Sequence, residues 1–480
     1  MITLCISIII LILGYRFYGK VIERIFGAEP ERPTPAISKT DGVDFVKLPL
    51  WKIFLIQFLN IAGLGPIFGA VAGALWGPVA FVWIVLGSLF AGGVHDYFCG
   101  MLSVRHEGES VSEVSGYYLG SWIKQFMRGF TVLLMIIVGA VFLLGPAKIL
   151  AGMTEGTISL FGWTMIILVY YMLSTILPID KIIGRLYPVF GFALLFMSLG
   201  LFAAMIFQGM NVPELGLSGF TNFHYESEDF PVFPMLFVTI ACGAISGFHA
   251  TQSPLMARCI SNEKQGKKVF YGAMVTEGMV ALIWAAISMG FFGGIKELNM
   301  EMLNNGDNTA LMVNKISNGA LGTLGGLLAI LGVVAAPITS GDTSFRSARI
   351  IIADFMKADQ KSIKNRLMIS IPLFLVGYLL TLVNFGVIWR YFAWTNQMLA
   401  TIVLWTVSVY LIRQDKNYWI ALIPSVFMTA VVVAYILLAP EGFSFPIVFS
   451  VTVGVIIALA LMGIVLFRVP GIKKTKTGLV

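Results

Sequence analysis

Residues 60–66 read Asn-Ile-Ala-Gly-Leu-Gly-Pro, and they interrupt an apolar run that extends from residue 52 to residue 76. A second apolar run, 232–253, contains Cys242-Gly-Ala-Ile-Ser-Gly-Phe-His249. Glycine and proline weaken or remove the backbone hydrogen bonds of a helix. Both runs are long enough to cross a bilayer, so the sequence predicts two membrane helices that open near their middles.

The chain as a whole has the composition of an integral membrane protein. Of its 480 residues, 58% are hydrophobic and 12% are charged, whereas a soluble domain carries about 25% charged residues. The first apolar run lacks the basic start and the cleavage site of a signal peptide, so we expect a retained helix. Thirteen runs approach the ~20 residues that a membrane helix needs. They lie at roughly 2–18, 52–76, 79–104, 129–151, 159–177, 183–208, 232–253, 269–293, 320–341, 367–386, 389–412, 418–438 and 444–467.

The basic residues predict the orientation of these helices. Thirteen crossings place successive connections alternately on two sides of the membrane, and lysine and arginine collect on the cytoplasmic side. With this count, 28 of the 32 Lys and Arg residues fall on one side, the exceptions being Lys148, Lys296, Lys315 and Arg390. We therefore expect the N-terminus outside and the C-terminus in the cytoplasm, in a plasma (inner) membrane. The net charge of +7 is then topological and indicates no nucleic-acid partner.

The two interrupted runs suggest an internal repeat. They are the second and seventh predicted helices, five apart, so they cross the membrane in opposite directions. Interrupted helices at corresponding positions of two inverted halves are typical of a transporter with its site near the midplane. Close helix packing is the alternative explanation, and it is the better one for Gly69 and Gly73. The predicted divisions of this all-α transmembrane domain are an extra helix at 1–18, repeats at 51–208 and 232–412, and two extra helices at 418–467.

The openings are the predicted substrate site. Gly63 and Gly243 each lie 11 residues inside their runs, near the midplane. Freed N–H groups and positive helix ends favour a substrate carboxylate, which peptides, amino acids and 2-oxo acids all carry. His249 is either a packing residue or a ligand or proton group. Asn60 and Gln252 either face substrate or satisfy freed backbone groups.

Three ionisable side chains in the apolar runs are candidates for proton coupling. His95 and Asp96 lie nine to ten residues before Arg105, and Glu277 lies nine residues after Lys268. Charged groups in a membrane are costly and usually functional. A buried carboxyl group suits proton uptake and release, and pairing with a cytoplasmic lysine or arginine is the alternative.

A cluster of oxygen-bearing side chains ends the ninth predicted helix, in Ala336-Pro-Ile-Thr-Ser-Gly-Asp-Thr-Ser-Phe-Arg346. Hydroxyl and carboxylate oxygens are the ligands that sodium prefers. The alternative is a polar helix end in which Asp342 pairs with Arg346 at i,i+4. The candidate cation site comprises Ala62, Thr339, Ser340, Asp342 and Thr343.

Two hydrophilic segments complete the chain. The linker of about 30 residues before Trp51 is predicted to be a surface strap. The outer segment 209–231 carries Glu214, Glu226, Glu228, Asp229 and His224. We expect a solvated acidic face there, with a weak metal site as the alternative.

Six blocks of this sequence resemble the carbon starvation protein A family, also called the peptide transporter carbon starvation family. They occur in consistent order from the second to the eleventh predicted helix, so the resemblance is specific. The blocks are Ala62-Gly-Leu-Gly-Pro-Ile-Phe-Gly69, Gly92-Gly-Val-His-Asp-Tyr97, Ser103-Val-Arg-His-Glu-Gly-Glu-Ser110 with Glu113, Ala241-Cys-Gly-Ala-Ile-Ser-Gly-Phe-His249, Gly341-Asp-Thr-Ser-Phe-Arg-Ser-Ala-Arg349 and Trp394-Thr-Asn-Gln397.

The resemblance implies the broken-helix, inverted-repeat fold of the amino-acid–polyamine–organocation superfamily, as in leucine transporters. It also implies particular site residues. Gly63, Gly65, Ser246, Gly247 and His249 would line the site. Asp96, Asp342 and Asn396 would support coupling, and we also place Asn396 among the substrate-binding residues.

We therefore expect a secondary transporter that imports small peptides, or a similar carboxylate-bearing nutrient, during carbon starvation. Alternating access would be coupled to a proton or sodium gradient, with no cofactor. The sequence shows no serine–histidine–aspartate set, metal pair or Gly-x-Ser-x-Gly elbow in readable context, so no enzyme is predicted. A proton-coupled pyruvate or 2-oxo acid symporter and, more remotely, a channel remain alternatives, and the oligomeric state stays open.

Overall fold

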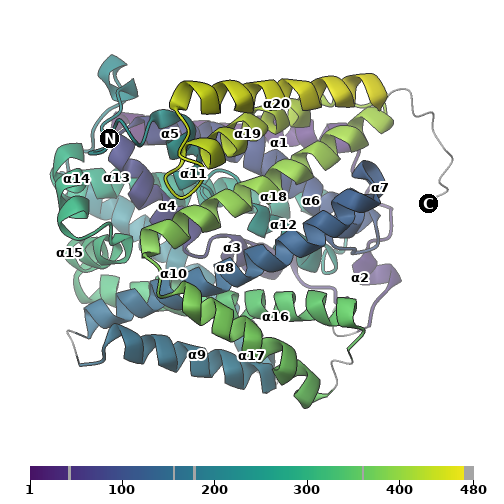
Figure 1. Cartoon of the computed structure of the whole chain (residues 1–480), viewed down its shortest axis with the longest axis horizontal. Coiled ribbons are helices and arrows are strands. Elements are labelled where there is room, and N and C mark those ends of the chain that lie inside the picture. The colour runs from purple at the N-terminus through teal and green to yellow at the C-terminus, as the bar shows by residue number, and fades with distance from the viewer. Residues whose placement is uncertain (42–44, 155–156, 177–179, 359–361, 470–480) are drawn as a thin grey trace.

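A computed structural model describes residues 1–41, 45–154, 157–176, 180–358 and 362–469, and these residues form helices and loops without a β-strand (Figure 1). The first half of the chain forms α1 (Ile2–Phe26), α2 (Pro35–Ser38), α3 (Leu50–Ile61), α4 (Gly65–Gly73), α5 (Val79–Leu86), α6 (Gly93–Arg105), α7 (Val111–Leu119), α8 (Ser121–Met153), α9 (Leu160–Ile176) and α10 (Asp180–Phe207).

The second half of the chain forms α11 (Phe237–Thr239), α12 (Gly247–Ala257), α13 (Gly272–Phe291), α14 (Ile295–Asn304), α15 (Thr309–Ala329), α16 (Ala336–Met356), α17 (Ile363–Leu380), α18 (Phe385–Arg413), α19 (Trp419–Leu438) and α20 (Ile447–Arg468). Short 3₁₀ or π-helical turns join several of these helices. They are η1 (Ala74–Trp76), η2 (Gly87–Gly92), η3 (Leu217–Phe220), η4 (Val232–Leu236), η5 (Glu263–Gln265), η6 (Lys267–Tyr271) and η7 (Ile330–Ala335).

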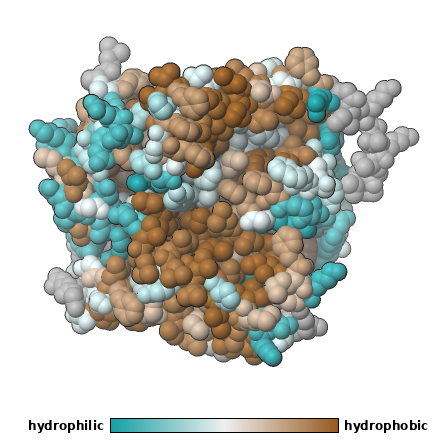
Figure 2. All heavy atoms as spheres, in the orientation of Figure 1, coloured by the Kyte–Doolittle hydropathy of each residue, from teal (hydrophilic) through white to brown (hydrophobic). Residues whose placement is uncertain are grey.

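The surface has the polarity of a membrane protein. Figure 2 shows hydrophilic residues toward the left and right ends of the molecule and a broad hydrophobic surface between them. In the same orientation, α14 marks the left end and α7 the right end, and we call these the α14 end and the α7 end (Figure 1). Ten helices of the described residues are long and apolar enough to cross a membrane, or eleven if the bent pair α3–α4 is one crossing.

The count of thirteen crossings therefore stays a prediction, for two physical reasons. One predicted run, 159–177, contains a helix of only 17 residues, α9. The other, 232–253, is divided into pieces that are each too short to cross alone, α11 and α12. The break within 232–253 was itself expected, and it accounts for one of the two missing crossings, because a helix broken in its middle forms no single continuous span.

Helices differ in how much of their surface other helices cover. Within their most apolar stretches, 94% of the residues of α18 are buried, as against 17% for α20. The span that contains α13 is 83% buried. The hydrophobic core therefore lies around α13 and α18, whereas α20 packs mainly on α19 and faces outward.

One sequence expectation about helix ends is wrong. The segment 336–346 was expected to end a helix, but α16 continues to Met356. Pro337 lacks the N–H that would bond to a carbonyl in the preceding turn. That preceding turn is η7, a π-helical turn whose altered hydrogen bonding accommodates the proline and lets the helix continue.

The predicted surface strap packs against the segment that follows α12. The backbone N–H of Glu29 donates to the Glu263 carboxylate at 2.7 Å, and the Thr34 hydroxyl donates to the carbonyl of Ile260 at 2.5 Å. Arg105 forms two hydrogen bonds with the same Glu263 carboxylate, at 2.5 and 2.8 Å. The strap thus ties α1 to the α7 end of the bundle.

Candidate functional site

The first predicted opening is a bend between α3 and α4. The two helices meet at 46° across the break that contains Gly63. Gly63 and Gly65 are buried, and a Cβ on either would overlap a neighbour, Phe142 for Gly63 and Cys242 for Gly65. Because Cys242 belongs to the second predicted opening, the two openings lie against each other inside the bundle.

The second opening extends from Ile240 to Ser246, between α11 and α12. Its freed carbonyl groups have partners on neighbouring elements. The indole N–H of Trp83 donates to the Ile240 carbonyl at 3.1 Å, and the Ser88 hydroxyl donates to the Gly243 carbonyl at 2.9 Å. Two carbonyl groups of the opening are therefore satisfied from α5 and η2, which stabilises it.

Asn396 of α18 holds the start of α12. Its side-chain oxygen accepts hydrogen bonds from the Ser246 hydroxyl at 2.9 Å and from the backbone N–H of Phe248 at 2.8 Å. This geometry is a helix cap supplied by another helix. The structure thus gives Asn396 and Ser246, both predicted to contact substrate, a bond to each other at the opening.

Four buried ionisable side chains form a chain of contacts directly beside α12's start. The Asp96 carboxylate lies between two histidines, 2.7 Å from His95 Nδ1 and 2.9 Å from His249 Nδ1. His249 Nε2 lies 3.4 Å from the Glu277 carboxylate. All four side chains have an exposed fraction of 0%. The structure therefore joins three predicted coupling residues to a fourth residue that was predicted to bind substrate.

The geometry dictates where protons can reside in this chain of contacts. An ionised Asp96 is acceptor-only, so each histidine presents its Nδ1–H to it and each Nε2 is left with a lone pair. A lone pair on His249 Nε2 would repel an ionised Glu277 carboxylate, so a proton between these two groups is favoured. That proton can reside on either group, and its movement exchanges a neutral pair for an ion pair.

No lysine or arginine neutralises these carboxylates among the described residues. The ion pairs of Asp96 and Glu277 involve His95 and His249 alone. Neither oxygen of Glu277 forms a hydrogen bond within the protein, and neither does Nε2 of His95. Buried groups in this condition are costly, which makes this cluster a candidate functional site.

The predicted amide residues lie on the two broken helices. Asn60 of α3 is 8% exposed, and Gln252 of α12 is 2% exposed. Gln252 donates to the Thr251 hydroxyl at 2.9 Å. Gln57 was not predicted, yet it is buried on α3, donates to Ser253 at 3.2 Å, and has an oxygen without a hydrogen-bond partner. An amide within the apolar run 52–76 was the signal that could have identified it.

The candidate cation site lies inside α16, where the hydroxyl groups donate hydrogen bonds to carbonyls of the same helix. The hydroxyls of Thr339 and Ser340 donate to the Ala336 carbonyl, at 2.6 and 3.2 Å, and Thr343 donates to Thr339 at 3.0 Å. The Asp342 carboxylate accepts hydrogen bonds from Ser174 and, at 3.1 Å, from Arg346. The i,i+4 pair weighed as the alternative is thus present. Ala62, the fifth predicted member, is buried at the end of α3.

The cavities at the two ends of the bundle differ in size. At the α7 end, a cavity of about 600 Å³ reaches Ala250 and Thr251, the residues next to His249. Glu113, Arg128 and Arg258 give its lining both charges. At the α14 end, the space beneath residues 222–230 measures only about 60 Å³. Among the described residues, the cavity at the α7 end is therefore much larger than the space beneath residues 222–230 at the α14 end.

Aromatic side chains fill the α14 end. The His224 ring lies 4.4 Å from that of Trp76 and 4.8 Å from that of Phe230, centroid to centroid. Burial, and then the positive charge of Arg390, lower the pKa of His224 to about 4. His224 is therefore neutral at pH 7 and packs as an aromatic residue. The described residues contain no group of three or more His, Cys, Asp or Glu side chains placed to hold a metal ion.

Comparison with known proteins agrees with this architecture. The family described as carbon starvation protein CstA matches residues 1–168, 157–319 and 306–434. The peptide transporter CstA of Escherichia coli K12 is 24% identical in an alignment that covers 88% of this chain and 78% of that protein. The pyruvate/proton symporter BtsT of the same organism is 26% identical over 340 residues, covering 58% of this chain and 47% of that protein.

Two further proteins are similar to this chain over most of their own length. An uncharacterized membrane protein of Haemophilus influenzae is 44% identical over 335 residues, covering 60% of this chain and 90% of that protein. The Eremococcus coleocola manganese transporter superposes with a TM-score of 0.52 at 15% identity, covering 89% of this chain and 97% of that one.

A second solved structure has the same architecture. Mhp1, a nucleobase-cation-symport-1 family transporter, superposes with a TM-score of 0.51 at 15% identity, covering 88% of this chain and 92% of that one. These two likenesses concern the fold alone, which this chain shares with both of those transporters. Because the family match extends along most of its length, the chain belongs to the carbon starvation protein CstA family.

Proposed function

We propose that this protein is a proton-coupled importer of small peptides that works by alternating access. The observation that carries the proposal is the buried chain of contacts from His95 through Asp96 and His249 to Glu277. It connects three elements, α6, α12 and α13, at the start of the broken helix α12. Proton binding there can alter the packing of α12, which is what coupling requires.

The proposal assigns the α7 end to the cytoplasm and the α14 end to the outside. The positions of lysine and arginine support this orientation, because 28 of the 32 fall in the connections that it assigns to the cytoplasm. The cavity of about 600 Å³ is then the cytoplasmic vestibule, and the aromatic cluster around His224 is the outer closure. The substrate would bind where this vestibule reaches Ala250 and Thr251 of α12, beside the two openings at Gly63 and Gly243.

Peptides are favoured over smaller substrates by the size of the vestibule. The vestibule lies within the ~300–1,000 Å³ of typical ligand pockets and is large for a three-carbon acid. Arg258 lines it and offers a partner for the carboxylate that peptides and 2-oxo acids share. The second candidate substrate is pyruvate, because one relative is named a pyruvate/proton symporter.

Uptake by purified protein in liposomes tests the substrate and the ion together. Labelled dipeptide and labelled pyruvate would each be offered under an inward proton gradient, with the other compound as competitor. The proposal predicts saturable dipeptide uptake that collapses with a protonophore. Saturable pyruvate uptake that peptides leave unchanged would establish the second candidate, and uptake driven by sodium alone would refute proton coupling.

A further inference from the structure

A second large cavity lies on the side of the bundle, among α1, α3, α10 and α13, and measures about 590 Å³. It is a groove open to the membrane rather than part of the vestibule. The side chains of Ile12, Trp51 and Phe192 on its rim are 49%, 58% and 57% exposed. Such exposure of apolar groups within membrane helices places the groove against lipid.

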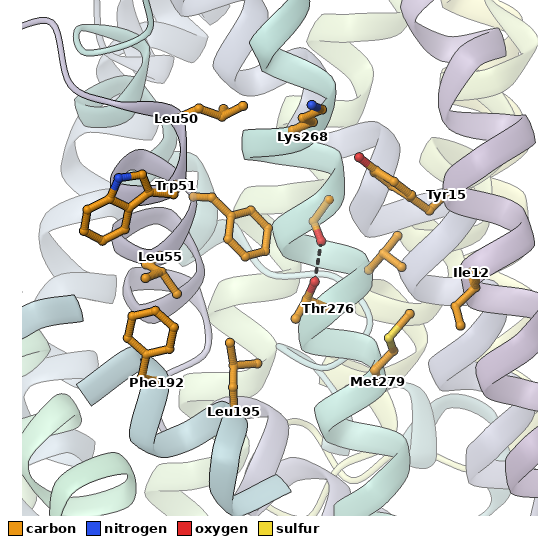
Figure 3. A pocket seen from close by; sticks show the side chains of 13 residues that line it. Ile12, Tyr15, Leu50, Trp51, Leu55, Phe192, Leu195, Lys268, Thr276 and Met279 are labelled. Atoms are coloured by element: carbon orange, nitrogen blue, oxygen red, sulfur yellow. Dashed lines mark hydrogen bonds between the residues drawn. The ribbon is translucent and has the colours of Figure 1, made fainter. Parts of the chain in front are cut away.

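The groove has a polar end and an apolar end. Figure 3 shows Lys268 and Trp51 at one end, with the Tyr15 hydroxyl directed toward the space between the helices. Phe192 and Leu195 lie at the other end. A ligand that fits this groove has a polar head and an apolar tail.

One hydroxyl group in the wall of the groove is already hydrogen-bonded. The Thr276 hydroxyl donates to the Gly272 carbonyl at 2.8 Å, so it is satisfied within its own helix (Figure 3). Gly272 leaves room between α1 and α3, since a Cβ there would lie 3.3 Å from the Tyr15 ring and 3.8 Å from the Phe54 ring. The space between these rings therefore depends on a missing side chain.

The charge at the polar end indicates the head group. Lys268 is exposed and lines the groove. Its neighbour Lys267 places its ammonium group 5.4 Å from the centre of the Tyr15 ring, against the same wall. Basic pockets between membrane helices bind the head groups of anionic lipids, and tryptophan favours the membrane interface.

We propose that this groove binds an anionic phospholipid, with its phosphate at Lys268 and an acyl chain along Phe54, Leu195 and Met279. The lipid would touch α3, the first half of a broken helix, and α13 at Thr276, the residue before Glu277. It would therefore contact two elements of the proposed transport machinery. Binding itself does not depend on which substrate or ion the protein carries.

Binding of phosphatidylglycerol and phosphatidylcholine to the detergent-purified protein tests the proposal, by native mass spectrometry. Wild type should bind phosphatidylglycerol about fivefold more tightly than phosphatidylcholine, since one lysine near a lipid head group contributes about 1 kcal/mol. Lys268→Gln should abolish that preference. The matched control Lys364→Gln removes a charge at the start of α17, away from the groove, and should retain it.

Filling the apolar end provides an independent arm. Thr276→Phe should reduce binding of both lipids, and Met279→Trp serves the same purpose if the first variant fails to fold. Equal binding of the two lipids by wild type, or an unchanged preference in Lys268→Gln, would overturn the proposal. Peptide uptake by the same variants is a separate readout, so failure of lipid binding is distinguishable from failure of the transport function.

Discussion

Two regions of this protein contain carboxylates where an ion could couple to transport, and they differ in how those carboxylates are bonded. At the start of α12, Asp96 bridges His95 and His249, and Glu277 has no hydrogen bond within the protein. Inside α16, Asp342 is bonded by Ser174 and Arg346, and the nearby hydroxyls bond to their own helix. The first region has groups available for a proton, and the second has an arginine where a cation would bind.

This difference favours a proton over sodium as the coupling ion. A sodium ion at Asp342 would compete with the charge of Arg346, which is already 3.1 Å from the carboxylate. A proton at Glu277 or His249 needs no displaced partner. The same comparison separates the roles of the two carboxylates: Asp96 would act in coupling, and Asp342 would stabilise the packing of α16 on α9.

The largest expected effect comes from Asp96→Asn. An amide cannot hold both histidine Nδ1–H groups as a carboxylate does, so the coupled protonation should be lost. Accumulation of substrate in liposomes under a proton gradient should fall to about the outside concentration, while exchange of internal for external substrate continues. Asp229→Asn, in the exposed outer segment, is the matched control and should behave as wild type. Accumulation by Asp96→Asn at the wild-type level would remove Asp96 from the coupling mechanism.

Glu277→Gln should have the next largest effect, on the dependence of uptake on pH. Glutamine keeps the shape of the side chain but cannot exchange a proton with His249, which lies 3.4 Å away. Initial uptake by wild type should rise as the outside is acidified from about pH 8 to about pH 5, and the variant should be flat over that range. A wild-type pH profile in the variant would limit the relay to Asp96 and the histidines.

Asp342→Asn tests the second region of the comparison, the cluster inside α16. Replacing the carboxylate removes the buried ion pair of Asp342 with Arg346, and we expect a loss of about 1–3 kcal/mol in the free energy of unfolding. The ratio of inside to outside substrate at a given proton gradient should stay unchanged. Thermal unfolding in detergent and accumulation in liposomes are the two measurements. Loss of accumulation in a variant that remains folded would transfer the coupling role to α16.

The smallest effect is expected from Thr339→Val and Ser340→Ala. Both hydroxyls donate to the carbonyl of Ala336, so their removal breaks bonds within one helix and leaves the site near α12 intact. Uptake rates should stay within about twofold of wild type, as for most changes away from the reacting groups. A new or lost dependence on sodium in either variant would revive the cation site predicted from the sequence.

Much of this architecture follows from the amino-acid sequence because membrane helices obey strict rules. Glycine and proline inside an apolar run have few explanations, so the openings at Gly63 and Gly243 were predictable from Gly-Leu-Gly-Pro and Cys-Gly-Ala-Ile-Ser-Gly. Intramembrane carboxylates are rare, which identified Asp96 and Glu277 as candidates. The end of α16 was not predictable from Pro337, because a π-helical turn before it keeps the helix continuous.

Contacts between segments that are distant in the sequence could not be predicted from such rules. His249 lies 153 residues from Asp96, and only the packing of α12 against α6 makes them neighbours. For the same reason, the sequence did not reveal that the side-chain oxygen of Asn396 caps α12. Periodicity identifies the face of a helix, but not the partner that this face meets.

The most direct test of proton coupling through Asp96 is the equilibrium accumulation ratio of substrate in liposomes, measured against the imposed pH difference. For one proton per substrate, wild type should gain about tenfold in accumulation for each pH unit, because one unit is worth ~1.4 kcal/mol per proton. Asp96→Asn should give a ratio of about one at every pH difference. A wild-type ratio that ignores the pH difference, or a steep response in Asp96→Asn, would contradict the account.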